Sequence, residues 1–361
     1  MGQLHLMKID EPIDEWIAAH EQDDDTEIQE TIRQLKLSQR VRAFARETLH
    51  LPVGEAYLSY ADIGRDFVVW NVFAAEELST DAHTWCYPVI GCAQYRGYFD
   101  KDEAAAYART LENRGLETHI GGVQAYSTLG WFNDPVLNTF LNRSDVQLAA
   151  LLFHELAHRL GYAKGDTEFN ESFATVIERF GVSIWLLADD GGNGQEAYAR
   201  YLKRSAANET FTQLVLAKRN ALTSLYANTS LNDQQKLLQK YSLFQELRVE
   251  LKHLDDSYAN LTRYSVWSET LSNAKLVPVN SYNRWVDAID HQLQKELAAA
   301  ACTHAQFFQQ VDQCRTGLEN FYKRLKKLIK ANPEQRLSTL QGWQLAYEAS
   351  KAPISVPTKL D

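Results

Sequence analysis

The sequence contains few cysteines, prolines and methionines, no long apolar run and no excess of positive charge. Its 361 residues include 4 Cys, 8 Pro and 2 Met, and 37 Lys and Arg stand against 47 Asp and Glu, which gives a net charge of −10. The apolar stretch at residues 67–73 is far shorter than the roughly 20 residues that span a bilayer. Because there is no basic stripe to bind a phosphate backbone, we expect no nucleic-acid partner.

Length and composition are those of a folded, globular chain. With 45% hydrophobic and 23% charged residues, the sequence has enough apolar side chains for a proper core, and its length allows one large or two medium domains. The chain as given begins at Met1 without an apolar segment and cleavage site, so it carries no export signal, although one could have been removed.

The four cysteines form two local pairs, Cys86 with Cys92 and Cys302 with Cys314, and neither pair has the double CxxC spacing of a structural zinc site. Proline and glycine between the first two favour a turn that would allow a disulfide. Residues 298–329 contain no proline and predict a continuous helix, which would hold the second pair about 18 Å apart. That bridge therefore requires a break in the helix, and buried free thiols are the alternative for both pairs.

The pattern of elements predicts a predominantly helical α+β protein with a small mixed sheet. Amphipathic helices are expected in the first fifty residues, and β-branched and aromatic runs predict strands at 57–60, 67–73, 85–99 and 118–127. Three further helices are expected at 102–111, at 144–160 behind a capping box at Ser144, and from 166 or 167 to 187. We therefore divide the chain into a helical scaffold, a module with the strands and a helical C-terminal region, at residues 1–50, 51–190 and 191–361.

Apolar residues beyond Gly194 repeat in steps of three and four, which predicts long helices packed as a bundle. The repeats run from Leu237 to Leu254 and from Val311 to Leu328, and we expect them to form intramolecular core rather than an interaction surface. Between them, residues 276–282 include a proline and predict a non-helical connector.

The helix expected at 144–160 carries the motif HExxH at residues 154–158. Side chains at positions i and i+4 lie on one helical face, so His154 and His158 can bind one Zn²⁺ while Glu155 lies beside the metal as a general base. The alternative is two ordinary helix histidines with Glu155 in a local ion pair. Because the rest of this helix is apolar, burying these three groups without a metal would be costly, and we favour the metal site.

A catalytic zinc normally takes three protein ligands and keeps one position open for water. Glu171 lies on the next expected helix, after a short turn, and is the third ligand that we predict. Glu178 is the rival candidate on the same face. If Glu171 coordinates the metal, we expect Glu178 to orient a histidine N–H instead.

These residues resemble a family of bacterial predicted aminopeptidases, which are zincin-like envelope proteins. The resemblance rests on HELAH at 154–158 followed by GDTEFNESFA at 165–174, and on shorter segments from about residue 51 to 187, among them VWNVFAA at 69–75, WCYP at 85–88, YRGYF at 95–99 and AYSTLGWF at 125–132. It implies a zincin-like core, a zinc hydrolase that acts on peptides, and often a lipoprotein signal upstream. The cell envelope or periplasm, with a lipid-anchored precursor, is the location that follows.

The motif is also similar to that of the gluzincins, the group of thermolysin and the zinc aminopeptidases, but its spacing departs from theirs. Those enzymes usually leave eighteen or nineteen residues before the ligand glutamate, whereas this chain leaves twelve before Glu171 and nineteen before Glu178. Their GxMEN motif is absent, because the only methionines are Met1 and Met7. Aminopeptidase specificity therefore follows from the family resemblance alone.

The chemistry expected of this site is hydrolysis by a metal-activated water with Glu155 as general base. Tyr126, on the strand expected just before the HExxH helix, is the catalytic donor that we name for the oxyanion, although tyrosines on strands more often serve packing. Further donors in or near the recognisable segments are Tyr95, Arg96, Tyr98 and Tyr282. In zincins that strand is usually the sheet edge with which the substrate backbone pairs.

Two other function classes are compatible with these residues. One is a metalloendopeptidase or a hydrolase of another amide, such as a cell-wall peptide. The other is a non-catalytic, metal-bearing envelope protein that captures peptides. A peptide is the expected partner in each case.

Overall fold

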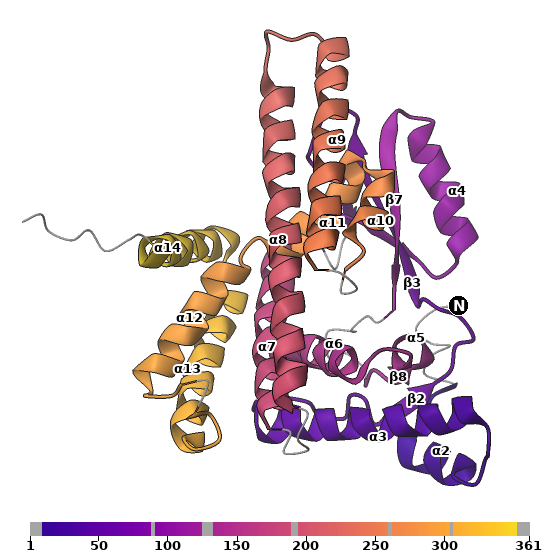
Figure 1. Cartoon of the computed structure of the whole chain (residues 1–361), viewed down its shortest axis with the longest axis vertical. Coiled ribbons are helices and arrows are strands. Elements are labelled where there is room, and N and C mark those ends of the chain that lie inside the picture. Colours follow the sequence, from indigo (N-terminus) through magenta and orange to yellow (C-terminus); the bar gives the residue numbers. More distant parts are fainter. Residues whose placement is uncertain are drawn as a thin grey trace, which may run out of the picture.

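A computed structural model describes residues 9–87, 91–124, 133–188, 194–258, 262–303 and 306–351. Helices predominate in these residues, together with three small sheets (Figure 1). The expected α+β class, predominantly helical, is confirmed. None of the described helices is long and apolar enough to cross a membrane.

The described strands are short, and most fall where β-branched and aromatic runs predict them. Their bounds are β1 (Glu11–Pro12), β2 (Ser59–Ala61), β3 (Val69–Glu76), β4 (Trp85–Tyr87), β5 (Gly91–Ala93), β6 (Arg96–Tyr98), β7 (Leu116–Val123) and β8 (Val136–Leu137). They form sheets in the orders β1-β2-β8, β6-β3-β7 and β4-β5. The run expected at residues 85–99 is thus three strands rather than one, and β1 and β8 were not expected.

The described helices make up most of the chain. Their bounds are α2 (Ile13–His20), α3 (Thr26–Glu47), α4 (Lys101–Glu112), α5 (Asn138–Leu141), α6 (Asp145–Ala157), η1 (His158–Leu160), α7 (Thr167–Leu187), α8 (Gly194–Ala227), α9 (Asp233–Ser257), α10 (Tyr264–Trp267), η2 (Ser268–Thr270), α11 (Asn273–Asn283), α12 (Val286–Ala299), α13 (Val311–Lys330) and α14 (Pro333–Lys351). The helices expected in the first fifty residues, at 102–111, at 144–160 and to residue 187 are confirmed.

The sheet β6-β3-β7 is antiparallel, and β3 and β7 pair along their whole length from Val69↔Val123 to Glu76↔Leu116. Helix α4 lies against one side of this sheet and α11 against the other (Figure 1). Beneath α4, a small apolar core forms from alternate residues of β3 and one face of the helix, because side chains on one face of a strand recur every second position: Val72, Ala74, Ala104, Ala108 and Leu111. β7 is an edge strand among the described strands.

Helices α6 and α7 form the centre of the molecule, with α3 packed against α6. The capping box expected at Ser144 is present, and the Ser144 backbone N–H donates a 3.3 Å hydrogen bond to Gln147 Oε1. Gly181 of α7 allows close approach, because a Cβ there would lie 2.9 Å from the Phe153 ring of α6. The two helices are therefore held in tight contact next to the HExxH segment.

The main apolar core draws on all parts of the chain. It includes Leu35 of α3, Phe153 of α6, Phe173 of α7 and Leu293 of α12, each almost fully buried. The three ranges 1–50, 51–190 and 191–361 thus share one core, and the division into them stays a prediction.

The C-terminal region contains a long helical hairpin, α8 and α9, whose far end projects beyond the rest of the chain (Figure 1). Most of the predicted repeat residues are buried within the protein, including Leu247 and Leu251 of α9 and Leu318 and Leu325 of α13, which confirms intramolecular packing. Tyr241 is an exception, because 65% of its surface is exposed.

Two predictions for this region are wrong. Residues 276–282 are not a connector but part of α11, which has Pro278 in its interior. The helix tolerates the missing N–H because Ser272 caps it and the burial of Ala274, Leu276 and Val277 stabilises it. The continuous helix predicted at 298–329 is interrupted between α12 and α13.

Both cysteine pairs are disulfides. Cys86 and Cys92 pair across the β4–β5 hairpin, and Cys302 and Cys314 join the end of α12 to α13. The break between these two helices is what brings the second pair together, with Cα atoms 4.9 Å apart. Cys302 and Cys314 are buried, whereas Cys86 and Cys92 are exposed.

Candidate metal centre

His154 and His158 lie one helical turn apart and face the same side, as the spacing of HExxH predicts. Their ring centroids are 5.0 Å apart, and both side chains are largely buried. His158 begins the short 3₁₀ turn η1, in which the chain leaves α6. The two imidazoles therefore point into one space at the C-terminal end of the helix.

Glu171, from the first half of α7, lies against these imidazoles. Its Oε2 is 3.1 Å from His154 Nε2 and 3.8 Å from His158 Nε2, and the three ligand atoms all lie within 4.8 Å of one another. Glu178 contacts the other nitrogen of the first histidine, with Oε2 3.1 Å from His154 Nδ1. This is the arrangement expected if Glu171 is the ligand and Glu178 orients the imidazole.

The chain returns Glu171 to the histidines through a turn that is fixed by hydrogen bonds. Gly161 ends η1 with φ at +145°, a conformation that side chains disfavour. The buried Asn170 amide then bonds both backbone groups of Ala163, at 2.9 Å each. Asp166 caps α7 at the Phe169 N–H and pairs with Arg336 at 2.6 Å. The residue beside Glu171 is thus tied to the turn that precedes it.

The three ligand atoms fit a divalent transition metal. Two neutral imidazole nitrogens and one carboxylate oxygen are a donor set of catalytic zinc, and ligands at 2.0–2.1 Å in a tetrahedron lie about 3.3 Å apart. The observed separations of 3.1 and 3.8 Å from Glu171 Oε2 bracket that value. The 3.8 Å separation is too long for a hydrogen bond, and His158 Nδ1 is buried with no partner among the described residues. With the described residues, His158 therefore makes no hydrogen bond that would account for its burial.

The charges of the site are strongly coupled. Burial raises the pKa of Glu155 to about 7, and burial lowers the pKa of His158 to about 4. Burial alone would also lower the pKa of His154, but hydrogen bonds to Glu171 and Glu178 outweigh it and hold that pKa well above its usual value. Burial alone would raise the pKa of Glu171, but the hydrogen bond from His154 outweighs this effect and lowers it. Glu155 is thus a buried carboxyl, next to His154 in sequence, whose pKa lies near neutrality.

Among the proposed oxyanion donors whose side chains the structure describes, Tyr95 is the one whose charge interacts with the acids of the site. Burial first, and then the negative charges of Glu171 and Glu155, raise the pKa of Tyr95 to about 12. Tyr126 lies outside the described residues, as does the side chain of Tyr282. Arg96 and Tyr98 contact Tyr107, with the Arg96 guanidinium 4.5 Å from the Tyr107 ring centroid, and so belong to a separate cluster.

Two tyrosines beside the acids of the site were not expected from the sequence. Tyr162 lies in the turn between α6 and α7. Burial is the larger cause that raises its pKa, and the negative charge of Glu171 is the second. Burial and then Glu155 raise the pKa of Tyr57 well above its usual value. Proximity of Tyr162 to HExxH was the only sequence feature that could have indicated either residue.

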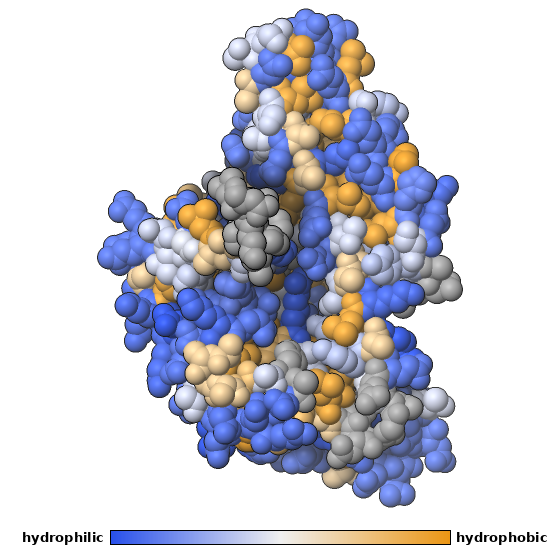
Figure 2. All heavy atoms as spheres, turned by 60° about the vertical axis from the view of Figure 1, so that its left-hand side comes forward, coloured by the Kyte–Doolittle hydropathy of each residue, from blue (hydrophilic) through white to orange (hydrophobic). Residues whose placement is uncertain are grey.

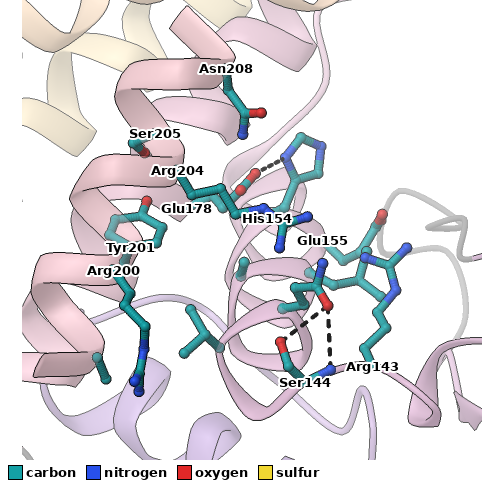
Figure 3. Close-up of a pocket in the computed structure, with 15 residues that line it drawn as sticks. Arg143, Ser144, His154, Glu155, Glu178, Arg200, Tyr201, Arg204, Ser205 and Asn208 are labelled. Atoms are coloured by element: carbon teal, nitrogen blue, oxygen red, sulfur yellow. Dashed lines mark hydrogen bonds and ion pairs between the residues drawn. The ribbon is translucent and has the colours of Figure 1, made fainter. Parts of the chain in front are cut away.

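A cavity of about 600 Å³ opens beside His154, between α6 and the N-terminal half of α8 (Figure 3). His154, Glu155 and Glu178 line it together with apolar residues of α6 and three arginines, Arg143, Arg200 and Arg204. α8 follows the HExxH helix by many residues, and no motif in it indicates this contribution. His158 and Glu171 do not line this cavity, so it meets the candidate metal centre only at His154 and Glu155.

The fold and the site thus define a helical α+β protein with a candidate three-ligand metal centre, one of whose histidines, His154, also lines a cavity. Over residues 1–340 the sequence matches the model of a protein family described as "Putative aminopeptidase", and the chain belongs to that family. No curated protein and no protein of known structure matches the sequence.

Proposed function

We propose that the protein is a zinc-dependent peptidase with a zincin-like core. The observation that carries the proposal is the convergence of one ligand atom each from His154, His158 and Glu171 within 4.8 Å of one another, with the buried Glu155 and a cavity next to His154. Membership of the "Putative aminopeptidase" family supports peptide-bond hydrolysis as the reaction. His154, His158 and Glu171 are the proposed ligands, and Glu155 is the proposed catalytic residue.

His154, His158 and Glu171 would hold the zinc ion, which would supply Lewis-acid polarisation of the scissile carbonyl and a lowered pKa of nearby water. Glu155 takes the proton from the attacking water and returns it to the leaving amine. Glu178 holds His154 in one orientation through Nδ1, which keeps Nε2 directed at Glu171. Tyr95, beside Glu155 and Glu171, is the donor proposed for the developing oxyanion, and Tyr126 stays a prediction.

The substrate backbone is proposed to pair with β7, which is an edge strand among the described strands. Aminopeptidase specificity is supported by the family name, and endopeptidase action or hydrolysis of a cell-wall peptide is the competing form of the same chemistry. Comparing N-terminally free with N-acetylated peptides separates the two forms. An aminopeptidase leaves the acetylated peptides intact, whereas equal cleavage of both excludes an obligatory aminopeptidase.

The test of the enzyme itself is Glu155→Gln, which keeps the size of the side chain and removes the base. Zinc-loaded wild type and variant are incubated with a peptide library, and products are mapped by mass spectrometry. We expect the wild type to cleave and the variant to lose at least about 100-fold in rate, the lower range for general-base catalysis. A zinc-loaded wild type that cleaves no peptide would leave the non-catalytic, peptide-binding alternative in its place.

The proposed location is an oxidising compartment such as the bacterial cell envelope or periplasm, with a lipid-anchored precursor. Support comes from the two disulfides, because such bonds persist outside the reducing cytosol. Cells are lysed in the presence of an alkylating agent, and the modified protein is weighed by mass spectrometry. Unmodified cysteines support this location, and four alkylated cysteines contradict it.

A further inference from the structure

The cavity beside His154 has an unusual charge for a site that would receive the free amino group of a peptide. Three guanidinium groups line it, against two carboxylates, Glu155 and Glu178. Glu178 already accepts a hydrogen bond from His154, and Glu155 is buried at the metal centre. Because arginine stays protonated at all physiological pH values, this charge is fixed, and a bound metal would add to it.

The three arginines differ in how far their charge is already compensated. Arg200 forms a 2.7 Å ion pair with Glu196, and Figure 3 shows its side chain directed away from His154. Arg143 donates a hydrogen bond to the Gln124 side chain, which is a neutral partner. Arg204 makes no hydrogen bond or ion pair with any residue that the structure describes, and its side chain extends from α8 toward α6 (Figure 3). Arg204 thus stands at the wall of the cavity without a direct partner for its charge among the described residues.

The rest of the lining suits the carbon chain of a side chain or peptide. Val146, Ala150 and Leu151 of α6 and Ala197 of α8 form its apolar part, and Tyr201 and Ser205 lie on the same wall as Arg204. A ligand with an apolar stem and a terminal carboxylate would place its stem on α6 and its charge against the guanidinium, which binds carboxylates with two parallel hydrogen bonds.

We propose that this cavity is a specificity pocket for a carboxylate, and that Arg204 binds a carboxylate of the substrate next to the scissile bond, with Arg143 contributing charge. The inference rests on the proposed peptidase function and adds its substrate class, which is an acidic peptide. The carboxylate comes from an acidic side chain or from the C-terminus of a short peptide. An α-ammonium group is disfavoured here, because it would face Arg204.

The test compares peptides that differ at one position. Hexapeptides carry Glu, Gln or Lys on either side of the cleaved bond, each made with a free and with an amidated C-terminus. We expect kcat/KM to be on the order of tenfold higher for Glu than for Gln, as for one charge-assisted hydrogen bond, and lower still for Lys. If the preference instead follows the free C-terminus, the terminal carboxylate is the ligand. Equal values for Glu, Gln and Lys and for both termini overturn the proposal while the peptidase function stands.

Variants assign the preference to Arg204. In Arg204→Gln the advantage of the Glu peptide over the Gln peptide should vanish, and Arg204→Glu should favour Lys. The control is Lys203→Gln, which removes one positive charge at the position just before Arg204 in α8. The Lys203 side chain is exposed and does not line the cavity. Equal losses for Glu and Gln peptides in Arg204→Gln overturn the proposed role.

A binding measurement separates this inference from the proposed function. The Glu, Gln and Lys peptides, with free and with amidated C-termini, are titrated by calorimetry into metal-stripped wild type and Arg204→Gln, where no cleavage occurs. Tighter binding of the carboxylate peptide by the wild type alone supports the pocket even if the zinc-loaded protein cleaves nothing. Identical binding of all peptides to both proteins overturns it.

Discussion

Glu178→Gln tests the division of roles between the two glutamates of α7. Glu178 Oε2 is 3.1 Å from His154 Nδ1, whereas Glu171 Oε2 lies 3.1 Å from His154 Nε2 and 3.8 Å from His158 Nε2. A residue that orients a ligand contributes about 10- to 100-fold to metal affinity, which is about 1.4–2.7 kcal/mol. We therefore expect Glu178→Gln to bind one zinc ion 10- to 100-fold more weakly, and Glu171→Gln to lose far more, because it removes a ligand.

Competition with a chromophoric zinc chelator at neutral pH measures both affinities. Glu319→Gln, an exposed position on α13, is the control for the loss of one negative charge and should bind zinc like the wild type. Stoichiometric zinc in Glu171→Gln together with its loss in Glu178→Gln would refute the reasoning, because it would exchange the two roles. Glu178 would then be the third ligand, and its spacing of nineteen residues from the motif would match that of the gluzincins.

Three further predictions concern the packing that positions the site. Asn170→Ala leaves the buried N–H and C=O of Ala163 without their partner, so we expect about 2–4 kcal/mol less stability toward urea and weaker zinc binding. An unchanged unfolding midpoint would mean that the turn between α6 and α7 is stable without these two hydrogen bonds. Gly181→Ala places a Cβ 2.8 Å from Leu49 and 2.9 Å from Phe153 and should lower stability by about 1–3 kcal/mol in thermal melts, whereas a rise would show that the helices have room to separate. Replacing Cys302 and Cys314 together by Ser removes a buried bridge across a loop of twelve positions and should cost about 3 kcal/mol in calorimetry, without effect on zinc stoichiometry; a loss of zinc would connect this bridge to the site.

The parts of the site that the sequence predicts are those set by local spacing. HExxH places two imidazoles on one face whatever surrounds the helix, and the capping box at Ser144 fixes where α6 begins. Because the turn between α6 and α7 is short, the start of α7, which carries Glu171, has to pack back against α6. The close pairing of Glu178 with His154 then follows from helical periodicity, since residues 171 and 178 lie on the same face of α7.

The parts that the sequence did not predict depend on contacts between distant segments. Pro278 is tolerated inside α11 because the burial of its neighbours stabilises the helix, and α12 ends at Ala299 without a proline, so that Cys302 reaches Cys314 of α13. Arg204 belongs to a helix without a motif, and only the packing of α8 beside α6 shows that it lines the cavity. Tertiary contacts of this kind override local propensity.

The central claim is that the two histidines and Glu171 hold one metal ion, and the metal content of the purified protein tests it most directly. The protein is loaded with Zn²⁺, dialysed and analysed by mass spectrometry of the metal, alongside His154→Ala, His158→Ala and Glu171→Ala, with circular dichroism to show that each variant is folded. We predict one zinc ion per wild-type chain and none in the folded variants. A wild type that retains no zinc, or folded variants that retain it in full, would contradict the claim.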